Sequence, residues 1–490
     1  MSTEKTALNW IGANEPVLTG LSDTIWSYAE PSLREWRSAS ATADLLRSYG
    51  FAIEWGTAGF PAAFVATRGG RGPVLGFNVE YDALPGLSQR AGVPYHDPIG
   101  YAGDPLYGPA YGPGHGCGHN ALAAASAMAA PADAAATALG DRATVRVFAS
   151  TGEEQLVGKA YAVRDGAYDG LDAFLDWHPA PVTATGWDVT SALISGTFTF
   201  LGSAGHGSDP LGTRSGLDGA LLLTTMIEHL RAANVSPSGR VSYTLSGGGA
   251  PNVTPDVQTV WVYVREATHE RARTLYDKVV ECAGAAATAG RTRLEHRLVT
   301  AIRQGLGNRA GAELLHHTMS ELGPARFADS DHEFALRLQA AIGRPRIGLA
   351  TGIAPLTPPP ETDLGGPSSD TSEVGWQAPH LSLVSPVVPL GVPLHSWAAT
   401  ASTGTNIAHQ GLLAAARYLA ATAVALVEQP ETLAAIRDEF DAREPWHSLL
   451  PADATPPRYP PPPEFLKETG QEFTLPALPF PVSTEPLGKI

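Results

Sequence analysis

The sequence predicts an α/β fold whose mixed, largely parallel sheet is interrupted by a separate α+β domain. The first and last parts of the chain alternate short apolar strands with helices, and polar residues stand at the ends of these strands. Between the two parts, residues 190–304 have the element order β-α-β-β-α-β, which is the order of a ferredoxin-like unit. These patterns indicate one α/β domain, with its site at the carboxyl edge of the sheet, and one inserted domain.

The first part of the α/β domain is expected to cover residues 1–189. Residues 25–51 predict two helices, with a break at Glu30-Pro31-Ser32 and a stop at Gly50. Buried strands are predicted at residues 63–66, 74–79, 144–149 and 173–176. An Ala-rich helix is predicted at residues 120–128 and resumes after Pro131, and residues 92–118 are expected to form a Gly- and Pro-rich loop.

The inserted domain, residues 190–304, is predicted from four strand patterns and two helix patterns. The strands are expected at residues 191–201, 240–245, 257–265 and 293–302, and the helices at residues 216–232 and 270–287. A complete unit of this kind between two halves of another domain is typical of a lid or a dimerisation domain.

The chain is then expected to return to the α/β domain over residues 305–443. Helices are predicted at residues 310–322, 332–342 and 405–427, a strand at residues 381–388, and a surface loop in the Pro-rich segment 344–367. Residues 444–490 are dense in Pro, so this tail is expected to lack regular structure and to lie on the surface.

The composition fits a soluble globular protein of two or three structural units. The chain has 490 residues, of which 43% are hydrophobic and 17% charged. Its formal net charge is −16 without any run of Lys or Arg, which argues against nucleic acid and anionic membranes as partners. We find neither a signal-peptide pattern nor an apolar run of membrane-spanning length, so a cytoplasmic location is expected. The two cysteines, Cys117 and Cys282, cannot form a disulfide framework.

The strongest local motif is the segment 114–120, which reads Gly-His-Gly-Cys-Gly-His-Asn. Cys117 and His119 are two residues apart, and in an extended segment their side chains would project to the same side. A thiolate and an imidazole could then bind one metal ion or two adjacent ions, and coordination would protect a thiol that is otherwise prone to oxidation. The alternative is an ordinary Gly-rich loop, since the spacing differs from the Cys-x-x-Cys pairs of closed structural zinc sites.

Further polar groups follow two predicted strands. Glu153 and Glu154 end one strand, where diverging carboxylates would let one bind metal while the other faces a metal-activated water. His178, in the segment Trp177-His178-Pro179, ends the next strand. Taken singly, the Glu pair could be a solvated acidic turn and His178 a structural residue. Their common place at one edge of one sheet favours a metal-dependent hydrolytic site, in which a general base moves a proton toward the leaving amine.

A set of motifs is spread along nearly the whole chain. They are residues 80–86 (EYDALPG), 114–120 (GHGCGHN), 152–154 (GEE), 161–166 (YAVRDG), 177–179 (WHP), 250–253 (APNV), 368–370 (SSD) and 393–397 (PLHSW). Together they resemble the metallopeptidase M20 family, in its amidohydrolase branch. The resemblance implies a catalytic domain of the zinc-exopeptidase type, an inserted lid domain, and a homodimer formed through that lid.

The resemblance also implies roles for individual residues. The metal ligands would be Cys117, His119, Glu154, His178 and His395, holding two divalent ions per subunit, Zn or Mn. Glu153 would be the general base.

On the lid, His206 would stabilise the tetrahedral intermediate and Asn252 would hold the substrate carbonyl or carboxylate. In related dimers such lid groups complete the active site of the partner subunit. Arg214 would face a substrate carboxylate, or it could be a solvated arginine at a helix start.

The resulting hypothesis is hydrolysis of a small amide, such as an N-acyl or N-aroyl amino acid. A dipeptidase of the same family is one alternative, and a non-catalytic binding protein on the same fold is another. Two departures from the family pattern lie near the expected substrate pocket. One is around the Glu pair, with Thr151-Gly152 before it and Gln155-Leu156-Val157-Gly158 after it, and the other is Gly205 in the lid motif. They bear on the identity of the substrate more than on the type of reaction.

Overall fold

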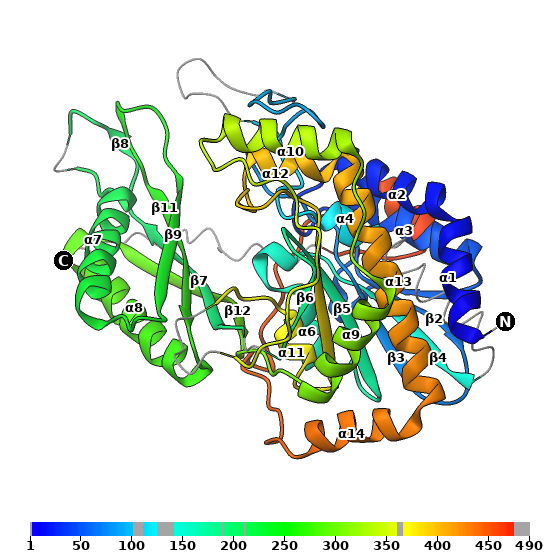
Figure 1. Cartoon of the computed structure of the whole chain (residues 1–490). Helices are drawn as coiled ribbons and strands as arrows, with labels where there is room; N and C mark the ends of the chain where they lie inside the picture. Colours follow the sequence, from blue (N-terminus) through cyan, green and yellow to red (C-terminus); the bar gives the residue numbers. More distant parts are fainter. Residues whose placement is uncertain are drawn as a thin grey trace.

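The computed structural model describes residues 2–100, 111–124, 142–187, 190–209, 212–359 and 366–474. These residues form an α/β domain and an inserted α+β domain that lie side by side (Figure 1). The fold class predicted from the sequence is confirmed. The domain boundaries near residues 189, 304 and 443 stay predictions.

The central sheet of the α/β domain has seven strands in the order β1-β2-β4-β3-β5-β13-β6. The inner strands β4, β3, β5 and β13 run parallel, whereas the pairs β1/β2, β2/β4 and β13/β6 are antiparallel. The strands are β1 (Ala52–Trp55), β2 (Phe64–Gly69), β3 (Val74–Val79), β4 (Thr144–Ala149), β5 (Ala173–Ala180), β6 (Ala184–Thr185) and β13 (His380–Pro386). Strand β3 is apolar and almost wholly buried, as expected for an inner parallel strand that is covered on both faces.

Helices pack around this sheet. The longest of the α/β domain is α13 (Asn406–Glu428), which packs against β13, α1 (Thr3–Ala13) and α9 (Arg309–Leu322). The others are α2 (Glu15–Tyr28), α3 (Trp36–Ser48), α4 (His119–Ala123), α6 (Gly158–Arg164), α10 (Asp329–Ala341), α11 (Thr371–Val374), α12 (Trp397–Thr403), α14 (Pro430–Asp441) and α15 (Pro463–Thr469).

Helix α13 corrects the expectation that no apolar run reaches membrane-spanning length. Among the described helices, it is the one that is long and apolar enough to cross a membrane. However, 78% of the apolar 18-residue stretch within this helix is buried inside the protein. Packing in the core accounts for this composition without a bilayer.

The inserted domain is a four-stranded antiparallel sheet with two helices packed on it. The sheet order is β12-β7-β11-β9, so the strands lie in the order fourth, first, third, second. The elements are β7 (Ala192–Leu201), α7 (Gly216–Asn234), β9 (Arg240–Gly247), β11 (Val257–Glu266), α8 (His269–Gly290) and β12 (Arg293–Ile302). Buried and less buried residues alternate along β11, because the helices cover one face of this sheet more fully than the other. The predicted β-α-β-β-α-β order is therefore correct.

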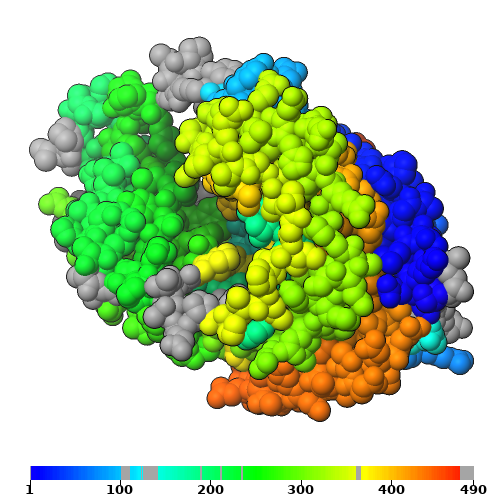
Figure 2. All heavy atoms as spheres, viewed as in Figure 1, coloured from blue at the N-terminus to red at the C-terminus, as the bar shows by residue number. Residues whose placement is uncertain are grey.

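The two domains share a packed junction next to the Glu153–Glu154 turn. The Tyr161 hydroxyl of α6 donates to the carbonyl oxygen of Val299 at 3.1 Å, and the Thr300 hydroxyl donates to the carbonyl oxygen of Leu156 at 2.6 Å. Leu156 and Tyr161 also belong to the apolar cluster that forms the core of the inserted domain. Figure 2 shows that the molecular surface is hollowed between the two domains.

The C-terminal tail corrects the prediction that residues 444–490 lack regular structure. Helix α15 has Pro463 in its first turn. N–H groups in the first turn make no hydrogen bond within the helix, so proline is tolerated at this position. Phe465 is buried and packs against Trp36 and Trp55, with ring centroids 5.4 and 5.5 Å apart. The Pro pattern did not reveal this helix, because the contacts that hold it come from residues near the start of the chain.

Several predicted elements lie partly outside the described residues, among them the surface loop at residues 344–367, described except for residues 360–365, and the tail at residues 444–490, described as far as residue 474. The Ala-rich helix at residues 120–128 and its continuation after Pro131 are described only as far as α4 and Ala124. The predicted loop at residues 92–118 is described except for residues 101–110, and its described parts contain no helix or extended strand.

Candidate metal centre

The carboxyl edge of the four parallel strands carries most of the candidate residues. The polar groups at this edge are Glu80 and Asp82 after β3, Glu153 and Glu154 after β4, His178 near the end of β5, and His395 after β13. Cys117 and His119 come from the loop that begins α4. Strand ends that meet at one edge of a parallel sheet explain why residues so far apart in the sequence can form one site.

The segment around Cys117 and His119 is not extended, which corrects the expectation from the sequence. Gly118 has a φ of 88°, in the left-handed region, and His119 is the first residue of α4. A Cβ at Gly118 would lie 2.9 Å from the Cβ of Pro179, so a larger residue would be both strained and crowded. A tight turn thus presents Cys117 and His119 to the same group of side chains.

The five predicted ligands come together in two overlapping groups. Ligand atoms of Cys117, His119 and His178 lie within 4.8 Å of one another, and so do those of Cys117, Glu154 and His395. Cys117 Sγ is 3.6 Å from His178 Nε2, and Glu154 Oε2 is 3.5 Å from His395 Nε2.

A third group of ligand atoms consists of Glu80, His119 and Glu153. Within it, His119 Nε2 lies 3.8 Å from Glu153 Oε2. The structure thus gathers all five predicted ligands and the predicted base into one cluster, which we call the metal cluster.

Hydrogen bonds orient two of the imidazoles in this cluster. Asp82 Oδ1 lies 2.9 Å from His119 Nδ1, and the other oxygen of Asp82 accepts bonds from the Ser32 hydroxyl and the Glu154 main-chain N–H. His178 Nδ1 lies 2.8 Å from the carbonyl oxygen of Pro179, which can only accept, so Nδ1 carries the proton. Because Nδ1 of each ring is engaged in this way, Nε2 of each ring is the nitrogen available to a metal.

The chemistry of the cluster fits divalent metal ions. Three buried atoms in or beside the cluster have no hydrogen-bond partner, namely Glu80 Oε2, His119 Nε2 and Glu154 Oε1. Buried polar atoms are costly unless a partner satisfies them, and a bound cation is such a partner. Thiolate, imidazole and carboxylate donors together suit zinc and similar first-row ions.

Burial shifts the acid–base behaviour of these groups. Burial and the neighbouring Glu80 hold the pKa of Glu153 well above its usual value. Burial, with Asp82 nearby, raises the pKa of Glu154 to about 8, and burial also raises the pKa of the Cys117 thiol. Burial acts in the same direction on Asp82, but its hydrogen bonds with His119 and Ser32 outweigh it and lower the pKa to about 2. A divalent cation would favour the charged forms of all these groups.

The three residues predicted to contact substrate are not part of this cluster. His206 lies on the short strand β8 (Gly205–His206), which pairs with β10 (Val253–Thr254) beside Asn252. The side chains of His206 and Asn252 are exposed. Arg214 lies in the same region, because its main chain forms an isolated β-bridge with Ser203. Figure 1 places β8 at one end of the inserted domain, away from the sheet of the α/β domain.

Four residues of the α/β domain join the site although no role was predicted for them. They are Glu80, Asp82, Lys159 and Asp370. Glu80 and Asp82 carry a usable signal, since they end a buried strand beside other polar strand ends. Lys159 carries none, because a single Lys in a short helix is usually exposed, whereas here it is fully buried.

The inserted domain reaches the site through β11. The Tyr263 hydroxyl donates to the carbonyl oxygen of Glu154 at 3.2 Å. Arg265 lies on the same face of this strand, its Nε is buried without a hydrogen-bond partner, and its charge acts on Glu153 and His395. The alternating pattern of β11 predicted a strand, but it could not reveal that this face meets another domain.

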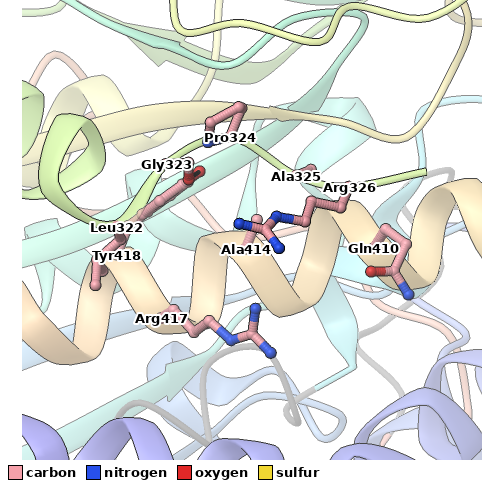
Figure 3. Close-up of a pocket in the computed structure, with 9 residues that line it drawn as sticks. All are labelled: Leu322, Gly323, Pro324, Ala325, Arg326, Gln410, Ala414, Arg417 and Tyr418. Carbon is pink, nitrogen blue, oxygen red and sulfur yellow. Dashed lines mark hydrogen bonds between the residues drawn. The ribbon is translucent and has the colours of Figure 1, made fainter.

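A surface pocket lies elsewhere on the α/β domain. It encloses about 340 Å³ between α13 and the segment that follows α9, and Figure 3 shows its lining residues, among them Arg326 and Arg417. The pocket shares no residue with the metal cluster. Its position therefore gives no reason to assign the hydrolytic site to it.

Comparisons with known proteins identify relatives of the chain, although no protein-family model matches it. The chain is 31% identical over 478 residues to a subunit of the p-aminobenzoyl-glutamate hydrolase of Escherichia coli (strain K12), and the match covers 91% of this chain and 97% of that protein. It is 28% identical over 285 residues to Xaa-Arg dipeptidase of Mus musculus, over 56% of this chain and 60% of that protein.

A solved structure shares the fold. It is the YXEP protein of Bacillus subtilis, described as a dinuclear metal binding peptidase from the M20 family. The TM-score is 0.51 at 16% identity, over 85% of this chain and 99% of that one. With the near full-length relative at 31% identity, this confirms the resemblance read from the motifs. The chain belongs to the M20 family, together with the p-aminobenzoyl-glutamate hydrolase of Escherichia coli, and it is a hydrolase of amide bonds.

Proposed function

We propose that the chain hydrolyses the amide bond of a small N-acyl or N-aroyl amino acid of the p-aminobenzoyl-glutamate kind. The observation that supports this most directly is the position of Glu153. Its buried carboxylate lies 3.8 Å from His119 Nε2, within a cluster that contains all five predicted metal ligands. A carboxylate beside a metal centre is what amide hydrolysis requires of a general base.

The proposed metal ligands are Cys117, His119, Glu154, His178 and His395, arranged for two divalent ions, Zn or Mn. When bound, such ions polarise the scissile carbonyl and make water a stronger nucleophile at neutral pH. Asp82 and the Pro179 carbonyl hold the His119 and His178 rings in the tautomers that present Nε2.

Glu153 moves the proton in this proposal. Its carboxylate takes a proton from the attacking water and then delivers it to the nitrogen of the leaving amine. Its buried position beside Glu80 stabilises the protonated form, which suits a group that must hold a proton between these two events. The side chain is shielded from bulk solvent, since Glu153 is only 6% exposed.

Arg265 and Arg214 are the two candidates for binding a substrate carboxylate. Arg265 is the better placed, because its side chain is near Glu153 and His395 and its Nε lacks a partner. A guanidinium can bind a carboxylate through two parallel hydrogen bonds. We expect Arg265→Lys to raise KM for a substrate with a free carboxylate and to leave KM for the corresponding amide unchanged.

A homodimer through the inserted domain would explain the exposed positions of His206 and Asn252. Among the described residues of this domain, five large hydrophobic side chains are exposed, namely Leu221, Leu222, Leu245, Val253 and Val257. Strand β9 is an edge of its sheet and most of its residues are exposed, so it can pair with another strand. Exposed apolar groups beside an open sheet edge favour a contact between two chains.

A complementation experiment tests this arrangement. His206→Ala and Glu153→Gln should each give an inactive protein, and mixing the two should restore activity if His206 acts in the partner's site. Mixing two batches of the same variant is the control. A dimer by light scattering whose mixture stays inactive would show that His206 does not act across the interface.

The reaction itself is tested with purified protein loaded with Zn or Mn. We expect release of the amine from N-acyl or N-aroyl amino acids, and Glu153→Ala should abolish release while metal content is retained. A dipeptidase is the competing activity, and it is favoured by the identity to Xaa-Arg dipeptidase. A dipeptide and its N-acylated analogue assayed side by side distinguish the two, since a dipeptidase cleaves the free dipeptide in preference.

A further inference from the structure

A buried cluster of charges adjoins the metal cluster but supplies none of its predicted ligands. Lys159 on α6 is fully buried, and its Nζ lies 2.7 Å from Glu80 Oε1 and 2.7 Å from Asp370 Oδ1. The second oxygen of Asp370 accepts a bond from the main-chain N–H of Lys159 at 2.9 Å. Asp370 therefore holds both the main chain and the ammonium group of Lys159, which leaves the ammonium little freedom to move.

This arrangement fixes the orientation of the Glu80 carboxylate. Its Oε1 accepts from both Lys159 Nζ and the amide of Asn78, the latter at 2.7 Å. Its Oε2 is buried without any hydrogen-bond partner and lies 3.6 Å from His119 Nε2. One oxygen is thus anchored, and the other is directed at the nitrogen that His119 offers to a metal.

The energetics of buried charges argue against a purely stabilising role for this cluster. A cation between two carboxylates leaves a net negative charge, and all three side chains are at most 2% exposed. Replacing such buried ionic groups by apolar ones is often neutral or stabilising, so stability alone is a weak reason for their presence. Position offers a better reason, because the free oxygen of Glu80 is one member of a group that could hold a metal ion with His119 and Glu153.

We propose that Lys159, held by Asp370, is a positioning residue that keeps one oxygen of Glu80 directed at the metal cluster, and that Glu80 in this orientation strengthens metal binding. The assignment of this centre to catalysis rests on the proposed function. The inference about metal binding does not depend on the substrate, and its test measures metal affinity directly.

The experiment compares Lys159→Met, Lys159→Arg, Glu80→Gln and the double variant Lys159→Met/Glu80→Gln with the wild-type full-length chain. Zn²⁺ and Mn²⁺ affinities are measured by competition with a chelator, and folding is measured by thermal unfolding. Lys467→Met, at an exposed position on α15, is the control for loss of a lysine. Asp331→Asn is the control for neutralising a buried carboxylate outside the metal cluster.

We expect Glu80→Gln to keep the wild-type unfolding temperature within a few degrees and yet to lose about 10- to 100-fold in metal affinity. Lys159→Met should lose a similar amount, and Lys159→Arg should recover part of it. The double variant should unfold at a higher temperature than Lys159→Met, because the Glu80 carboxylate no longer stays buried without its cation and only Asp370 does, but its metal affinity should stay low.

The opposite pattern would overturn the inference. If the cluster serves stability alone, Glu80→Gln will bind metal like the wild type, and the double variant will regain metal affinity together with stability. Should Lys159→Met fail to fold, Glu80→Gln and Lys159→Arg still decide the question. A wild-type chain that binds metal but cleaves no amide would contradict the proposed function while leaving this test intact.

Discussion

The carboxyl edge of the α/β sheet and the β8–β10 end of the inserted domain carry different parts of the proposed site, and they differ in how they are built. At the sheet edge, Glu153 and His119 are buried, and Asp82 orients the His119 ring. At the end of the inserted domain, His206 and Asn252 are exposed, and no buried group orients either side chain among the residues that the structure describes. The metal cluster is thus organised within one chain, whereas the proposed substrate contacts require movement of the inserted domain or a second chain.

The largest effect that separates the two regions should come from Glu153→Gln. This change removes the proposed base but keeps the size of the side chain, so kcat should fall by about 100- to 10,000-fold. Metal content, measured by elemental analysis, should remain that of the wild type. The matched variant Glu154→Gln should instead lose metal, and equal metal loss in both variants would contradict the separate roles.

His206→Ala should have the next largest effect. Loss of one group that stabilises a developing oxyanion typically lowers kcat by about 100- to 1,000-fold. Because His206 is exposed, the unfolding temperature and the metal affinity should not change. Ser208→Ala, which removes the hydroxyl 2.8 Å from His206 Nδ1, is a milder control. A His206→Ala protein with wild-type kcat would remove the β8–β10 end from the proposed mechanism.

Asp82→Asn should have an intermediate effect. The amide can still contact His119 Nδ1 but no longer provides a negative charge, so we expect a loss of about 10- to 100-fold in metal affinity or kcat. Chelator competition and steady-state kinetics measure the two quantities separately. Ser32→Ala removes only one bond to Asp82 and should cost less, and the reverse ranking would show that orientation of His119 is not what Asp82 provides.

The smallest effect should come from Tyr263→Phe, which removes the bond between the inserted domain and the Glu154 carbonyl. One hydrogen bond contributes about 0.5–1.5 kcal/mol to the free energy of unfolding, measured by denaturant titration. Tyr243→Phe is the control within the same domain, since its hydroxyl bonds to Glu228 at an exposed position. If Tyr263→Phe and Tyr243→Phe lower the free energy of unfolding equally, the contact of β11 with the site contributes no more than a hydrogen bond at an exposed position.

Much of the fold could be predicted because the signals for it are local. The strands at residues 74–79, 144–149 and 293–302 have the predicted limits, since apolar runs with polar ends mark buried strands. Helix α15 was missed for the opposite reason. Its stability depends on Phe465 packing against Trp36 and Trp55, and no local pattern records such a contact.

The candidate site was also predictable in part. Cys117, His119, Glu154, His178 and His395 were named from motifs, and the structure gathers their ligand atoms, although their roles as ligands stay a prediction. The extended geometry predicted for this loop was wrong at Gly118. The loop makes a left-handed turn there, in close contact with Pro179, which is distant in the sequence. Arg265 and Tyr263 were missed, since their relation to Glu154 exists only where two domains meet.

The sequence by itself determined the α/β class, the inserted β-α-β-β-α-β unit and the edge of the sheet where the candidate site residues gather. These follow from hydrophobic periodicity and from polar residues at strand ends, which are properties of short segments. Only the tertiary structure decided which oxygen of Glu80 faces His119, and that Lys159 and Asp370 hold it there. Buried ion pairs join residues far apart in the chain, and their geometry is set by the packing of whole elements rather than by any local pattern.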